Sequence, residues 1–205
     1  MIESYENTIQ VIILLICVGI TLYRALTYWS RTWTMLFYFY ACWLLADTYW
    51  VVCLFIYKQT PQISLIPDLS WYASFIFLYL LLNRVAPVEG RITGNLLPWL
   101  GPAFAAVMGI YFMTFGAILA NLVTAILMGI LLYASIRRLL ERERYRKQNF
   151  LVTHVFIFCL LEYGMWISSC IWSGDTLAYP YYWFDFLLTI NFLFLIPAAK
   201  KAVVS

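Results

Sequence analysis

Four carboxylic acids lie within or at the edge of long apolar runs: Asp47, Asp68, Glu162 and Asp185. A charged side chain inside a membrane costs on the order of 3 kcal/mol by insertion scales, so it usually faces a bundle interior or a cavity. Helical rise counted inward from the ends of the runs places Asp47 and Glu162 about 15 Å deep, Asp185 about 6 Å deep and Asp68 at the rim. The acids therefore trace a path from one surface to the midplane.

Aromatic rings at one-turn spacing are expected to flank the two deep acids. They are Tyr40, Trp43 and Trp50 beside Asp47, and Phe158 and Trp166 beside Glu162. A carboxylate between π faces suits an amine or ammonium, because the ring quadrupole and the negative charge attract the same cation. No Lys or Arg is expected at this depth, so the counter-ion would be a ligand, a metal ion or a proton.

A structural interpretation stays open beside the binding site. One or both deep acids could be protonated and hydrogen-bonded across helices, since intramembrane polar groups also tie helices together. The polar side chains available on neighbouring runs are Thr48, Ser74, Asn121, Thr124 and Asn191.

His154 is the only histidine in the chain. It lies about 12 Å below Glu162 along the same helix, where it could relay protons or simply be an interfacial residue with a satisfied ring. A lone histidine argues against a zinc hydrolase, and the five cysteines form no CxxC pair. The sequence predicts no metal site and no cofactor.

The composition identifies the solvent of these residues as a lipid bilayer. Hydrophobic residues make up 64% of the 205 and charged residues only 11%, with a mean hydropathy of +0.83. Soluble domains carry about a quarter charged residues. We therefore expect an all-α integral membrane protein, a seven-transmembrane-helix bundle in one polytopic domain with no soluble domain. The helices are expected at 8–27, 33–57, 66–82, 97–114, 117–136, 150–172 and 181–198.

The fourth and fifth helices are separated by a reversal rather than by a polar loop. Residues 96–136 would form a single helix of about 60 Å, twice the hydrocarbon thickness. The reversal is expected at Thr114–Gly116, where glycine offers a positive φ.

The basic residues predict an orientation. With seven spans, the first, third and fifth loops and the C-terminus collect twelve of the thirteen Lys and Arg residues, and the other side has only Lys58. By the positive-inside rule the N-terminus is outside and the C-terminus is cytoplasmic. The twelve are Arg24, Arg31, Arg84, Arg91, Arg137, Arg138, Arg142, Arg144, Arg146, Lys147, Lys200 and Lys201.

A weak internal repeat raises the hypothesis of a 3+1+3 parallel arrangement. The second and sixth runs each place an acid one or two residues after Leu-Leu and a tryptophan about one turn later. Two three-helix units joined by a fourth helix is an arrangement that parallel-repeat transporters use. Coincidence in a Leu-rich aromatic sequence is the alternative, and the repeat assigns no family.

Three functions fit these residues. The first is a small permease for a small, cationic, proton-coupled solute, located in the inner or plasma membrane of a bacterium. The second is a membrane receptor or sensor subunit that signals to a cytoplasmic or membrane partner protein. The third is an intramembrane hydrolase with an Asp47–Glu162 acid dyad. Phosphate-loop, serine-hydrolase and zinc-protease motifs are absent, which favours a non-enzymatic role, and no nucleic acid partner is expected.

Overall fold

The computed structural model describes residues 2–60, 64–88, 95–172, 174 and 176–203, and these ranges contain helices and no strands. The helices are α1 (Ile2–Tyr28), α2 (Arg31–Val52), α3 (Leu65–Val85), α4 (Leu100–Met113), α5 (Ile118–Leu140), α6 (Asn149–Ile171) and α7 (Pro180–Val203). A π-helical turn, η1 (Cys53–Tyr57), continues α2, and a 3-10 turn, η2 (Leu97–Trp99), precedes α4. The predicted all-helical fold is confirmed.

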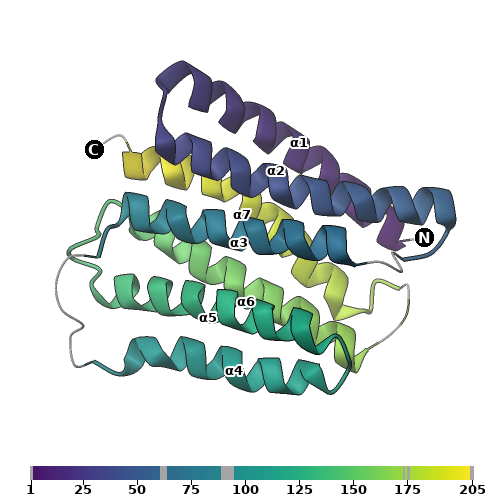
Figure 1. Cartoon of the computed structure of the whole chain (residues 1–205). Coiled ribbons are helices and arrows are strands. Elements are labelled where there is room, and N and C mark those ends of the chain that lie inside the picture. The colour runs from purple at the N-terminus through teal and green to yellow at the C-terminus, as the bar shows by residue number, and fades with distance from the viewer. Residues whose placement is uncertain (1, 61–63, 89–94, 173, 175, 204–205) are drawn as a thin grey trace.

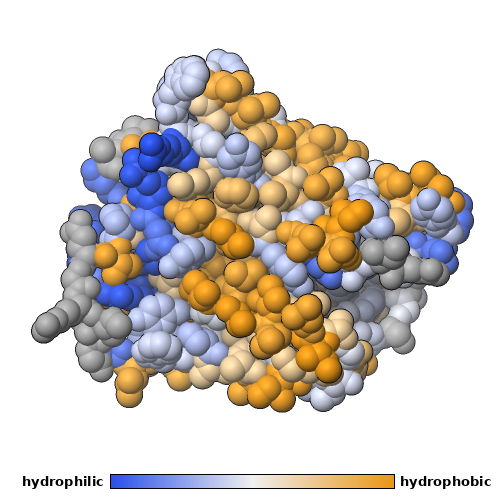
Figure 2. All heavy atoms as spheres, viewed as in Figure 1, coloured by the Kyte–Doolittle hydropathy of each residue, from blue (hydrophilic) through white to orange (hydrophobic). Residues whose placement is uncertain are grey.

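Six of these helices are long and apolar enough to cross a membrane, by length and composition, and the segment Leu97–Met113 is a shorter apolar helix. A helix satisfies its backbone hydrogen bonds within itself, which hydrocarbon requires of any spanning segment. Figure 2 shows the result on one face: an apolar band across the middle and hydrophilic atoms at one end. The chain is therefore a multi-pass helical membrane protein.

Six helices form a closed ring, and α4 lies outside it. The ring runs α1, α2, α3, α5, α6, α7 and back to α1, whereas α4 packs mainly on α5 (Figure 1). The connections alternate between the two ends of the bundle, with the α1–α2, α3–α4 and α5–α6 connections at the end that holds the C-terminus. The basic side chains of these connections gather there; Arg91 lies outside the described residues.

The packing pattern repeats when α1, α2 and α3 are exchanged with α5, α6 and α7. Helix α3 packs on α5 as α7 packs on α1, and α2 touches α7 as α6 touches α3. Each exchanged pair runs in the same direction along the bundle. Under this exchange, Asp47 of α2 and Glu162 of α6 occupy equivalent helices.

Helix α1 begins earlier than expected, at Ile2 rather than at residue 8. Its first turns are polar, yet Asn7 and Gln10 are only 8% and 3% exposed. Gln10 has a polar partner on α7, whereas Asn7 donates within α1 to the Glu3 carbonyl oxygen and the Glu6 carboxyl. A polar helix face is stable in a membrane protein when it turns inward.

The reversal between α4 and α5 lies where the sequence indicated. Gly116 has φ +113° and Ala117 has φ +47°, two successive residues in the left-handed half of the map. Asn121 donates to the carbonyl oxygens of Phe112 (3.1 Å) and Gly116 (2.7 Å), which closes the turn. Asn121 is thereby used locally and does not reach either deep acid.

Small residues let α4 approach α5 closely. A Cβ built on Gly101 would lie 2.7 Å from the Cβ of Leu132 and 3.1 Å from the Tyr133 nitrogen, and one on Gly109 would lie 2.7 Å from the Cβ of Ala125. Close backbone contact of this kind replaces the hydrophobic effect as the source of helix association in lipid. The small-residue stripe of α4 therefore serves internal packing.

We expect Gly101→Ala to lower the free energy of unfolding by about 1–3 kcal/mol, because the added methyl group meets the backbone of α5 rather than a flexible side-chain end. Thermal unfolding of the detergent-solubilised protein measures this. The matched control is Gly19→Ala, since a Cβ there meets nothing within 4 Å. That variant should be neutral or more stable, because alanine is the better helix former. Equal effects of the two substitutions would contradict the close α4–α5 contact.

Candidate functional site

The two deep acids lie together in the bundle core. Asp47 on α2 is 4% exposed and Glu162 on α6 is 2% exposed, and their charges interact. Asp47 Oδ2 and Glu162 Oε1 are both buried without a hydrogen-bond partner. Within the described part of the chain, no Lys, Arg or His forms an ion pair with either acid. Two buried carboxyls within electrostatic reach of each other thus have unused hydrogen-bonding capacity.

The indole rings of Trp43 and Trp71 border Asp47. Both approach its carboxyl with their N–H edges, although Trp71 Nε1 has no hydrogen-bond partner of good geometry. Trp50 packs against Trp71 with ring centroids 6.1 Å apart, and Trp50 Nε1 donates to Glu3 Oε1 at 3.4 Å. The predicted aromatic flank of Asp47 therefore exists for Trp43, while Trp50 is linked to the acid through Trp71.

An aromatic layer forms the floor of the acid site on the side of the basic end. Its rings come from α2, α3, α6 and α7, with centroids 5.2–5.9 Å from a neighbour in the layer. The layer consists of Phe39, Trp43, Phe75, Phe158 and Phe192, each at most 4% exposed. Trp43 and Phe158 lie four residues before Asp47 and Glu162, about 6 Å along each helix. The layer thus separates the acids from the basic end.

On the opposite side, the site is covered by residues near the start of α7 and α1. The half-buried Tyr181 interacts electrostatically with Glu162, Asp47 and Glu3. This tyrosine and the α1 acid were not among the predicted site residues. The only available signal was their polarity at the edge of apolar runs, which also suits an interfacial position.

Asp185 belongs to a structural tie rather than to the central pair. It is 3% exposed, and its Oδ1 accepts a 2.8 Å hydrogen bond from Gln10 Nε2. The bond joins α7 to α1. Asp68 is half-buried in the first turn of α3, at the end of the bundle where the predicted path begins.

Two other predicted residues make contacts away from the acids. Tyr40 is fully buried and donates a 2.6 Å hydrogen bond to the Phe192 carbonyl oxygen, which ties α2 to α7. The Trp166 ring packs on Phe112 of α4 and on Tyr163, so it does not mirror the tryptophans beside Asp47. The aromatic surroundings of Glu162 are therefore narrower than expected.

His154 lies below the aromatic layer and is paired with α7. Its Nδ1 lies 2.6 Å from Asn191 Oδ1, and Asn191 Nδ2 donates to the His154 carbonyl oxygen at 3.1 Å. The ring packs edge-on against Phe150 and stacks on Phe194. These contacts match the satisfied histidine of the structural interpretation. They also occupy Asn191, which was a possible partner for the acids.

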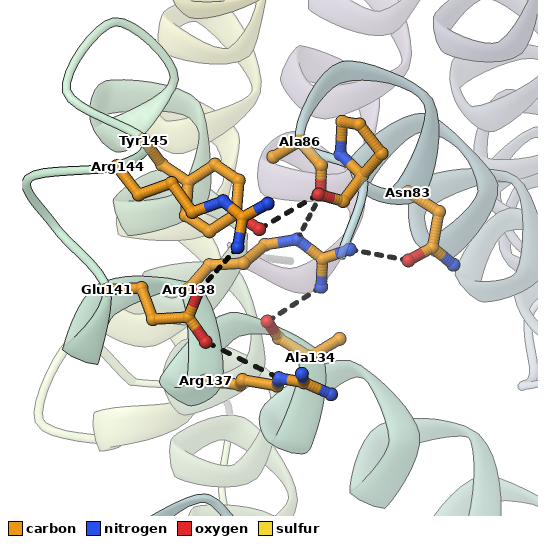
Figure 3. Close-up of polar contacts among 9 residues, drawn as sticks. Asn83, Ala86, Ala134, Arg137, Arg138, Glu141, Arg144 and Tyr145 are labelled. Atoms are coloured by element: carbon orange, nitrogen blue, oxygen red, sulfur yellow. Dashed lines mark hydrogen bonds and ion pairs between the residues drawn. The ribbon is translucent and has the colours of Figure 1, made fainter. Parts of the chain in front are cut away.

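Arg138 was counted as a loop cation, yet it is 1% exposed (Figure 3). Its Nε donates to the Ala86 carbonyl oxygen and one terminal nitrogen donates to Ala134, each at 2.8 Å, while the other terminal nitrogen bonds Asn83 Oδ1. The last carbonyls of a helix have no partner within it. Arg138 supplies that partner for α3 and thereby joins α3 to α5 at the basic end.

The described side chains around the acids offer few ligands for a metal ion. In the described residues, no group of three or more His, Cys, Asp or Glu side chains could hold a metal ion. The deep acids offer two carboxyls, which suits a monovalent organic cation better than a divalent ion that needs six or more oxygen ligands.

We expect Gln10→Leu to destabilise the bundle by about 1–3 kcal/mol, because it leaves the buried Asp185 carboxyl without its donor. Asp185→Asn is the matched control, since its amide oxygen can still accept the Gln10 hydrogen bond. Thermal unfolding in detergent should show a clear loss for the first variant and a small change for the second. An unchanged Gln10→Leu variant would mean that the α1–α7 contact does not depend on this bond.

Comparison of the chain with protein-family models, curated proteins and solved structures finds no match. The function therefore has to be inferred from the geometry of the acid site.

Proposed function

We propose that this protein is a membrane permease for a small organic cation, an amine or ammonium compound, bound between Asp47 and Glu162. The observation that carries this proposal is the coupled carboxyl pair, in which each acid keeps a buried oxygen without a partner. A buried charge left unpaired is strongly unfavourable. A bound cation compensates one of the two carboxylate charges, and a proton takes its place when the cation has left.

The indoles beside Asp47 support the same ligand indirectly. Trp43 and Trp71 turn their N–H edges toward the Asp47 carboxyl and so help to hold it in place. A cation bound between the acids would exchange its hydration shell for the two carboxyls.

In the proposed orientation all seven helices cross the membrane, with the basic end in the cytoplasm of a bacterial cell. The positive-inside rule supports this orientation. The acid site is then reached from the outside, past Asp68, Tyr181 and Glu3. The aromatic layer beneath the acids corresponds to the closed inner gate.

The repeated packing pattern offers a way to open that gate. Transporters built from repeats rock one unit against the other around a fixed central site. Here the units are α1–α3 and α5–α7, and they meet at the α1–α7 and α3–α5 contacts. Asp47 and Glu162 come from different units, so a relative movement of the units changes the distance between the carboxyls.

We expect Asp47→Asn and Glu162→Gln each to reduce amine uptake by about tenfold or more, because each removes one of two charges that hold the cation. Proteoliposome uptake assays measure this with radiolabelled methylamine and longer alkylamines. The lumen of the proteoliposomes is made either acidic or neutral. The control is Glu143→Gln, a carboxyl at the basic end away from the pair. Its uptake should remain near that of the unaltered protein.

The alternatives give different outcomes in the same preparation. Amine binding without uptake would favour a receptor that passes a helix shift to a partner protein. A lipid or peptide cleaved only when both acids are present would favour the acid-dyad hydrolase. Unchanged uptake in both acid variants would overturn the permease.

A further inference from the structure

A second site is a groove between α3, α4 and α5. It lies across the bundle from the contact between α1 and α7. The groove has a volume of about 880 Å³. That volume falls in the range of sites that hold drug-sized ligands. Most of its lining is apolar, including Ile76, Ala106 and Ile126.

The groove exists because α4 lies outside the ring. Helix α4 packs closely on α5 through Gly101 and Gly109 and makes little contact with α3. The space between α3 and α4 is therefore not filled by another helix and stays open to the outside of the bundle. Lining residues such as Ile76 and Ile126 are 46% and 54% exposed.

The groove runs the length of α5 and changes character at the basic end. From Leu122 to Arg137 the helical rise is about 22 Å, more than half the thickness of the hydrocarbon core. At its basic end the lining includes Asn83, Trp99, Tyr133 and Arg137. Trp99 and Tyr133 pack with ring centroids 5.0 Å apart, as amphipathic rings do at the headgroup level.

The two arginines at this end differ in how many of their N–H donors are used within the protein. Arg138 spends its nitrogens on Ala86, Ala134 and Asn83 (Figure 3). The Nε of Arg137 is buried, has no hydrogen-bond partner and lies 3.6 Å from Glu141, which also lies 3.8 Å from Arg144. A guanidinium has five N–H donors, so Arg137 retains donors for a ligand.

We propose that this groove binds a phospholipid with an anionic headgroup, whose acyl chain lies along α4 and α5 and whose phosphate meets Arg137. An apolar channel that ends in a guanidinium with N–H donors beyond its ion pair with Glu141 complements an anionic amphiphile. The Glu141 carboxylate already lies beside Arg137 and would repel a headgroup that carries two negative charges. The site therefore selects a singly charged headgroup such as phosphatidylglycerol. The site is separate from the acid pair and does not depend on the proposed transport.

Native mass spectrometry of the purified protein tests this, with phosphatidylglycerol and phosphatidylcholine of identical chains added in turn. We expect one tightly retained phosphatidylglycerol and about tenfold weaker retention of phosphatidylcholine. Arg137→Gln should remove the preference between headgroups, and Arg137→Lys should restore part of it. Ala106→Trp, which fills the groove from an exposed position, should weaken retention of both lipids.

Arg142→Gln is the matched control, because Arg142 is a cation of the same end that does not line the groove. It should keep the headgroup preference. Equal loss of preference in Arg137→Gln and Arg142→Gln would mean nonspecific attraction of annular lipid to the basic end, and would overturn the site. Unchanged retention in Ala106→Trp would overturn the groove as the place of the acyl chain. Thermal unfolding of each variant confirms that it is folded.

Discussion

Hydrocarbon offers no water to a polar group, and each polar side chain of this bundle has to find its partner inside the protein. Several do so across helices. Gln10 bonds Asp185, Tyr40 bonds a carbonyl of α7, His154 pairs with Asn191, and Arg138 bonds the end of α3. These bonds link helices that are far apart in sequence, and they lie at several depths of the ring.

The Asp47–Glu162 pair differs from these ties, because each acid has one buried oxygen without a hydrogen-bond partner. The same holds for the Trp71 Nε1 beside Asp47. Breaking a buried ion pair by removing one partner costs 3–5 kcal/mol in typical cases, so a bundle would rarely retain two such acids for packing alone. The pair is best understood as half of an interaction whose other half is a mobile cation or proton.

The sequence predicted the helices and the depth of the acids because both depend on hydropathy and on helical rise, which act locally. The proximity of Asp47 and Glu162 followed less directly, from the inward orientation that any intramembrane acid favours. Partners across helices could not be predicted. Nothing near Gln10 or Arg138 in the sequence indicates Asp185 or Ala86, since those contacts depend on which helices are neighbours. Trp166 is a further example. It lies about one turn after its acid, as Trp50 does, but its ring packs against Phe112 of α4.

The central claim is that the two carboxyls hold one cation between them, and a double-mutant cycle tests it most directly. Amine-dependent thermal stabilisation would be measured for the unaltered protein, Asp47→Asn, Glu162→Gln and the double variant. A shared cation predicts strong coupling, in which the double variant loses little more stabilisation than either single variant. Additive losses, with each single variant keeping about half of the stabilisation, would show two independent acids and contradict the shared site.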